Sequence, residues 1–131
     1  MMPTPPAIIQ TVHAVDLDAL LEAISAVESR GRDDAVGANG ERGRYQMKRE
    51  TWQELTHESF DKAYDPVYAT PVARQRMFRL KWELAERHVA VTPETLALMW
   101  KCGANAAILA KWTDRRDRNY AIRVANLYKD R

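Results

Sequence analysis

The chain has 131 residues, a formal net charge of +2 at pH 7 and hydrophobic residues at 46% of positions. This length is enough for one core, which would bury somewhat more than about 60% of the surface that the unfolded chain exposes, and it leaves no room for a second domain. The small charge does not indicate nucleic-acid binding, although a mildly basic surface suits an anionic polymer. The single cysteine, Cys102, excludes an internal disulfide framework and is expected to be a small packing residue.

The N-terminal segment 1–15 is expected to be an extension in front of one domain over residues 16–131. It begins with MMPTPPAIIQTV, which is rich in proline and carries neither a basic start nor a sustained apolar run. We therefore expect no signal peptide in this segment as written. No stretch approaches the roughly 20 apolar residues that span a bilayer, so we expect a soluble chain without membrane insertion.

The first helix is predicted from an apolar stripe that repeats every three or four residues: Leu17, Leu20, Leu21, Ile24 and Val27. Asp16 is a good N-cap for this helix, and Gly31 lies where it should stop. Glu28 follows Ile24 by one turn on the same face. Partial desolvation at the edge of the core would raise the pKa of Glu28 toward neutrality, as general-acid catalysis requires. The alternative is a glutamate that merely ends an amphipathic helix.

A turn-rich loop is predicted next, because residues 30–43 hold four of the five glycines and two aspartates. Its backbone can take positive φ and approach a ligand closely. A short helix should follow from Lys48 to Leu55, with Trp52 facing inward. A small hairpin near Gly37 to Tyr45 is an alternative for part of the loop.

The rest of the chain is also predicted to be helical. Thr70 before Pro71 should open a long helix with a stripe of Ala73, Met77, Leu80 and Leu84, broadened by Phe78 and Trp82. Thr92 before Pro93 should open a central buried helix that contains Leu96, Met99 and Trp100 and is interrupted at Gly103. A short helix around Ala106 to Ala110 and a final helix marked by Tyr120, Val124, Leu127 and Tyr128 complete an all-α fold.

Beyond these patterns, the stretch LLEAISAVESRGRDDAVGANGERGRYQMKRETW, from Leu20, resembles the first half of the catalytic domain of soluble lytic transglycosylases and goose-type lysozymes. The elements that match are Glu28 with Ser29, Ala35 with Val36, Gly40 and Gly43, Gln46, and Thr51 with Trp52. LALMWKCGANAA resembles the family's aromatic-asparagine-alanine-glycine segment, and NYAIRVANLY resembles its closing helix. The resemblance covers about Ala19 to Tyr128 and implies a lysozyme-like domain.

The activity implied by this resemblance is cleavage of the β-1,4 bond between N-acetylmuramic acid and N-acetylglucosamine in peptidoglycan. Glu28 would protonate the glycosidic oxygen and then act as base on the sugar's 6-hydroxyl, giving a 1,6-anhydro product while the substrate's N-acetyl group stabilises the cation. A water-using lysozyme is the hydrolytic variant. Glycosidases generally use two carboxylates, and Asp33 and Asp34 are the nearest but weaker candidates for the second.

Four residues near Glu28 are candidates for substrate binding. Ser29 could bond to substrate or to Glu28, or simply help to end the helix. Gln46 suits an acetamido sugar because its amide both donates and accepts. Tyr45 would offer a stacking face for a sugar, and Gly43 would let the backbone approach it.

Two further candidates lie late in the chain. Tyr120 could orient Glu28 through its hydroxyl, as the family's tyrosine is thought to, or could be a core tyrosine. Lys101 stands where the family shows asparagine, and its ammonium could lower the pKa of Glu28 and weaken catalysis. Asn105, about one helical turn after Lys101, could supply the side-chain amide of the family's asparagine instead. Arg44, another departure from the family, would point to solvent or meet a carboxylate of the substrate's peptide.

Other classes of site find little support. The three histidines are far apart, no glycine loop cradles a phosphate, and nothing activates Ser29 as a nucleophile. We therefore expect no metal and no cofactor, and surface or loop positions for His13, His57 and His88. Trp52, Trp82 and Trp112 are expected to lie in the core.

The partner predicted by the resemblance is peptidoglycan, acted on by a monomer in the cell envelope, periplasmic or extracellular, after delivery by an unknown route. The alternative is a glycan-binding or structural module that kept the fold and lost turnover. A small nucleic-acid binder is a distant third possibility. Its only support is the basic run Arg115, Arg116 and Arg118, and such a run is more typical of a solvated helix face.

Overall fold

The computed structural model describes residues 14–103 and 114–131. This part of the chain is mainly helical, with α2 (Leu17–Ser29), α3 (Arg49–Leu55), the 3-10 helix η1 (Phe60–Tyr64), α4 (Pro66–Glu86), α5 (Pro93–Cys102) and α7 (Arg115–Lys129). The described residues form no strand, and the possible hairpin is reduced to two isolated antiparallel bridges, Val36 with Arg42 and Arg42 with Met47. The predicted all-α class is confirmed for these residues.

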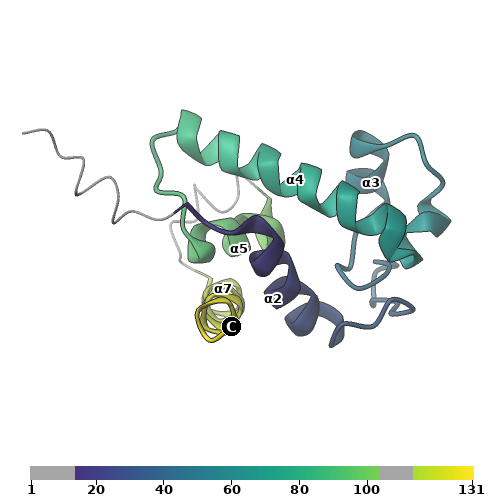
Figure 1. Cartoon of the computed structure of the whole chain (residues 1–131), viewed down its shortest axis with the longest axis horizontal. Coiled ribbons are helices and arrows are strands. Elements are labelled where there is room, and N and C mark those ends of the chain that lie inside the picture. Colours follow the sequence, from purple (N-terminus) through teal and green to yellow (C-terminus); the bar gives the residue numbers. More distant parts are fainter. Residues whose placement is uncertain (1–13, 104–113) are drawn as a thin grey trace, which may run out of the picture.

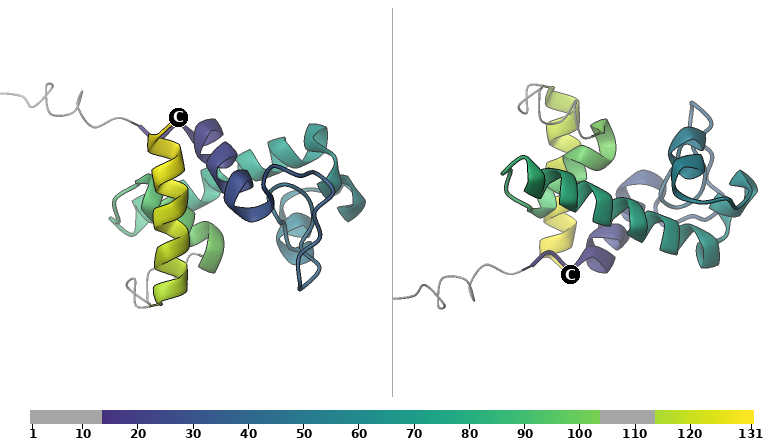
Figure 2. Two further views of the ribbon diagram at one scale, coloured as in Figure 1. Left: turned by 90° about the horizontal axis from the view of Figure 1, so that it is seen from below. Right: turned by 90° about the horizontal axis from the view of Figure 1, so that it is seen from above.

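The longest helix, α4, runs along the molecule, with α3 and η1 near one end and α5 with α7 toward the other (Figure 1). α7 packs against both α5 and α2. Figure 2 shows the C-terminus beside the start of α2. There the backbone N–H of Asp16 donates a 3.0 Å hydrogen bond to the hydroxyl of Tyr128. This contact ties the start of α2 to the C-terminal part of α7.

Helix α2 begins and ends as its sequence predicts. The Asp16 carboxylate accepts a 3.0 Å hydrogen bond from the N–H of Ala19, which satisfies one of the free donors at the helix start. At the other end Arg30 and Gly31 both take positive φ, 58° and 74°. This left-handed turn ends the helix directly after Glu28 and Ser29 and leads into the loop.

Helix α4 does not begin where the sequence analysis placed it. The prediction of a start at Thr70 and Pro71 was wrong, because Asp65 and Pro66 give the same start signal earlier. The Asp65 carboxylate accepts a 2.9 Å hydrogen bond from the N–H of Val67. Pro71 lies inside the helix, where it cannot donate to the carbonyl of Val67, but its exposed position keeps that carbonyl near water.

The core follows the predicted stripes with two exceptions. The exposed fractions of Phe78 and Trp82 are 47% and 65%, so their predicted place in the buried stripe was wrong, and Leu127, which marks the final helix, is 45% exposed. Phe78 and Trp82 are offset from the buried line of α4 by one or two residues, which turns them away from it. Trp52 is fully buried as predicted, and its indole N–H donates to the Glu58 carbonyl at 2.8 Å.

Helix α5 is the buried helix that the sequence indicates. Thr92 and Thr95 form a reciprocal capping box at its start, and Gly103, with φ of 80°, ends it. All residues from Leu96 to Trp100 are buried. His13, Asn105, Trp112 and the helix predicted around Ala106 to Ala110 lie outside the described residues. None of the described helices combines the length and apolar character needed to cross a membrane.

Candidate active site

Glu28 opens onto a cleft of about 350 Å³. Its lining comes from the loop, from α3 and from the end of α5, with one residue each from α2 and α4. The residues that line the cleft are Glu28, Asn39, Glu41, Gln46, Lys48, Thr51, Arg76, Trp100, Lys101, Cys102 and Gly103. The cleft thus gathers three predicted site residues, Glu28, Gln46 and Lys101, from separate parts of the chain.

The carboxyl group of Glu28 is held in a half-buried position at the end of α2. Burial raises the pKa of Glu28 above its ordinary value, because the charged form loses solvation. The hydroxyl of Tyr120, on α7, donates a 2.9 Å hydrogen bond to Glu28 Oε2, and this contact favours the ionised form and lowers the pKa. The effect of burial is the larger, so Glu28 keeps its proton to higher pH than an exposed glutamate.

Tyr120 lies where an orienting role requires. It is buried, with an exposed fraction of 8%, and burial together with the nearby charge of Glu28 raises the pKa of its hydroxyl. The phenol therefore stays protonated and donates. Both interpretations of this residue apply, since Tyr120 belongs to the core and its hydroxyl is satisfied by Glu28.

Arg76, on α4, also lines the cleft and was not among the site residues expected from the sequence. Its guanidinium lies 4.3 Å from the centre of the Trp100 ring and donates a 3.0 Å hydrogen bond to the Trp100 carbonyl. Burial lowers the pKa of Arg76, while the nearby Tyr120 and Glu28 raise it. The one available signal was its spacing, since Arg76 lies three residues after Ala73 and four before Leu80, on the buried side of the helix.

Lys101 lines the cleft from the last turn of α5. Its side chain is exposed, with the ammonium 5.2 Å from the centre of the Tyr120 ring. Its charge lowers the pKa of Glu28, as expected from the sequence, but by less than the hydrogen bond from Tyr120 does and by less than burial raises it. The pKa of Glu28 is therefore raised overall despite the charge of Lys101.

Ser29 and Gln46 hold the loop in place. The Ser29 hydroxyl is buried within reach of two carbonyl oxygens, that of Ser25 at 3.1 Å and that of Arg44 at 2.8 Å. These contacts match the interpretation that Ser29 helps to end the helix. The Gln46 amide donates to the carbonyls of Gly43 at 2.9 Å and Ala35 at 3.3 Å, so only its Oε1 remains to face a ligand.

Gly43 and Tyr45 lie away from the cleft lining. Gly43 has a φ of 81°, and a Cβ there would collide with the carbonyl oxygen of Ala63, so the glycine lets the loop pack on η1. Tyr45 is buried, with its hydroxyl 2.9 Å from Thr70 Oγ1. The structure therefore gives Tyr45 a core position rather than an open face for a sugar in this cleft.

The second carboxylate in the cleft is not one of the two aspartates expected from the sequence. Asp33 forms a two-pronged ion pair with Arg44, Nε to Oδ1 at 2.7 Å and Nη2 to Oδ2 at 3.3 Å, and Asp34 is exposed. Neither lines the cleft. Glu41 does, and its charge raises the pKa of Glu28. No local pattern singles out Glu41, because only the folding of the loop brings it opposite Glu28.

Gly37 makes room for two of the cleft residues. A Cβ at this position would lie 2.5 Å from Gln46 Oε1 and would collide with Glu41 Oε1. Glu41 also accepts a 2.9 Å hydrogen bond from the backbone N–H of Asn39. The loop thus points one carboxylate and one amide oxygen into the same region of the cleft.

In the part of the chain that the structure describes, Cys102, His57 and His88 are not arranged for nucleophilic or metal chemistry. Burial raises the pKa of Cys102 to about 12, so this thiol is a poor nucleophile near neutral pH. It packs partly buried against the core, as predicted. His57 and His88 are exposed, and the described residues contain no group of side chains suited to hold a metal ion.

Comparison of the chain with protein-family models, curated proteins and solved structures finds no match.

Proposed function

We propose that this protein cleaves the β-1,4 bond between N-acetylmuramic acid and N-acetylglucosamine in peptidoglycan, through Glu28 as general acid on a lysozyme-like helical domain. The observation that carries the proposal is the position of Glu28. It ends an apolar helix face, opens onto a cleft, has a pKa raised by burial and accepts a hydrogen bond from Tyr120. A carboxyl with these properties suits proton donation near neutral pH.

The proposed reaction begins with Glu28 protonated and directed at the glycosidic oxygen. Transfer of its proton lets the bond break, with the electron pair leaving on the departing sugar. The resulting carboxylate is stabilised by the Tyr120 hydroxyl and by the charge of Lys101. In the lytic route Glu28 then removes the proton of the sugar's 6-hydroxyl, which attacks the anomeric carbon and closes the 1,6-anhydro ring.

The hydrolytic variant gains support from Glu41. A second carboxylate in the same cleft is what water activation requires, and neither Asp33 nor Asp34 lines the cleft. Product analysis separates the two routes, because the lytic route leaves 1,6-anhydro ends and hydrolysis leaves reducing ends.

A glycan-binding module without turnover remains the second candidate, and its supporting observation is Lys101. Its ammonium acts on Glu28 in the direction that opposes proton donation. Clearing of a suspension of purified cell walls distinguishes the two candidates, since only an enzyme lowers the turbidity. The enzymatic proposal also implies action as a monomer in the cell envelope, periplasmic or extracellular, reached by a route that the sequence does not indicate.

A further inference from the structure

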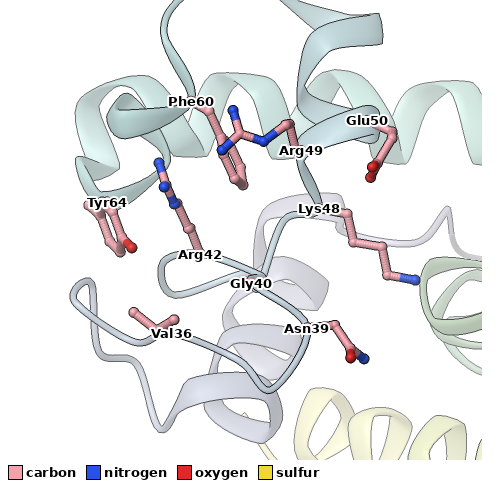
Figure 3. Close-up of a pocket in the computed structure, with 9 residues that line it drawn as sticks. All are labelled: Val36, Asn39, Gly40, Arg42, Lys48, Arg49, Glu50, Phe60 and Tyr64. Carbon is pink, nitrogen blue, oxygen red and sulfur yellow. The ribbon is translucent and has the colours of Figure 1, made fainter.

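A second hollow, of about 670 Å³, adjoins the Glu28 cleft and is not used by the reaction proposed above (Figure 3). We call it the basic compartment. It is lined by Val36, Asn39, Gly40, Arg42, Lys48, Arg49, Glu50, Phe60 and Tyr64. Asn39 and Lys48 line both spaces, so a ligand that occupies the cleft can extend into this compartment.

The lining of the basic compartment is dominated by cations. It contributes three positive side chains, Arg42, Lys48 and Arg49, against a single carboxylate, Glu50. Figure 3 shows the Lys48 side chain reaching from this compartment toward α5, which is the direction of the Glu28 cleft. Positive charge therefore follows the path between the two spaces and favours a ligand with negative charge.

Two of these cations are held by aromatic rings. The guanidinium groups of Arg42 and Arg49 lie 4.4 Å and 4.9 Å from the centre of the Phe60 ring, and that of Arg42 also lies 5.2 Å from the Tyr64 ring (Figure 3). Stacking occupies the flat face of a guanidinium and leaves the N–H groups at its edge available. Arg42 already donates to Asp61 at 2.9 Å, so Arg49 is the guanidinium with more donors left for a ligand.

We infer that the basic compartment binds the carboxylate-bearing peptide carried by the glycan strand whose backbone lies in the Glu28 cleft. This inference rests on the proposed function. A guanidinium edge binds a carboxylate with two parallel hydrogen bonds, and Lys48 adds a point charge beside it. Val36, 65% exposed, and the ring of Tyr64 supply apolar surface for the peptide's short side chains. A strand without peptides fills the cleft and leaves this compartment empty.

The test compares two ligands that differ only in the peptide. One is a soluble peptidoglycan tetrasaccharide that carries its peptides, and the other is the same tetrasaccharide after an amidase has removed them. Calorimetric titration of the full chain with Glu28→Gln, which prevents turnover, gives both dissociation constants. The peptide-bearing ligand should bind about tenfold more tightly, and that preference should fall as salt is added.

Substitutions then locate the preference. Arg49→Gln should weaken binding of the peptide-bearing ligand by about tenfold and leave binding of the peptide-free ligand unchanged. Lys48→Gln should weaken binding of the peptide-bearing ligand more than binding of the peptide-free ligand, because Lys48 lines both spaces but only the peptide brings carboxylates to it. The matched control is Arg79→Gln, on an exposed position of α4 outside both spaces, which should change neither constant.

Equal affinities for the two ligands, or equal losses on both in the Arg49 variant, would overturn the inference. So would equally tight binding of a single-stranded oligonucleotide, which would mean general attraction of polyanions. Failure of the proposed function looks different, because wall clearing by the unsubstituted protein is measured separately. Clearing without a peptide preference rejects the compartment alone, and a peptide preference without clearing rejects the catalytic proposal alone.

Discussion

Replacing Tyr120 with phenylalanine removes the hydrogen bond to Glu28 and little else. The 2.9 Å contact joins a neutral hydroxyl to a carboxyl that is partly exposed. A hydrogen bond to a charged group contributes about 1.5–3 kcal/mol, and the exposure of Glu28 favours the lower end of that range. The bond stabilises the ionised carboxylate more than the neutral acid, so its loss should make ionisation up to about tenfold less favourable and raise the pKa of Glu28 further.

The expected result of Tyr120→Phe is a displaced pH dependence. Because the acid form of Glu28 starts the reaction, the alkaline limb of the wall-clearing rate should move to higher pH, while the maximal rate falls through poorer orientation. Tyr128→Phe is the matched control, since it removes another hydroxyl contact on α7, with Asp16, far along the helix from Glu28. An alkaline limb that coincides in Tyr120→Phe and the unsubstituted protein would refute the assignment of Glu28 as the acid.

Three other outcomes follow from the same geometry. Lys101→Asn should also move the alkaline limb of the clearing rate upward, but by less than the tyrosine substitution and with a difference that shrinks as salt is added. Gly43→Val should destabilise the protein to heat by about 2 kcal/mol or more, because its left-handed φ and the Ala63 carbonyl exclude a branched side chain, whereas Arg44→Ala should cost about 1 kcal/mol or less. In urea titrations, wild-type stability should fall as pH rises through the raised pKa of Glu28, and Glu28→Gln should not show this fall, so the variant becomes the more stable protein at alkaline pH.

The parts of the fold that local chemistry dictates could be predicted from the sequence. Asp16 and Thr92 cap their helices as expected, and Glu28 continues the apolar face of α2. The start of α4 could not be assigned in the same way, because Asp65 with Pro66 and Thr70 with Pro71 give two start signals a few residues apart. Only the packing of the folded chain distinguishes them, since a proline in an early, exposed turn is tolerated.

The parts of the site that depend on contacts between distant segments could not be predicted. Tyr120 and Glu28 are 92 residues apart in the chain, and their pairing was expected only through a family resemblance. Glu41 stands in no sequence pattern that indicates a functional site. Arg76 shares the buried side of α4 with apolar residues, and this spacing alone does not indicate a site residue. Tyr45 has an aromatic ring of the kind that stacks on sugars, yet its neighbours in the fold bury it. Which side chains of a loop face the cleft is decided by tertiary packing rather than by sequence pattern.

The central claim is that Glu28 supplies the proton for glycan cleavage. The most direct test compares clearing of purified cell walls by the unsubstituted protein and by Glu28→Gln, after circular dichroism and thermal unfolding have shown that the variant is folded. The amide keeps the shape of the side chain and loses the transferable proton, so clearing should fall by about 100-fold or more. Near-normal clearing by folded Glu28→Gln would contradict the claim.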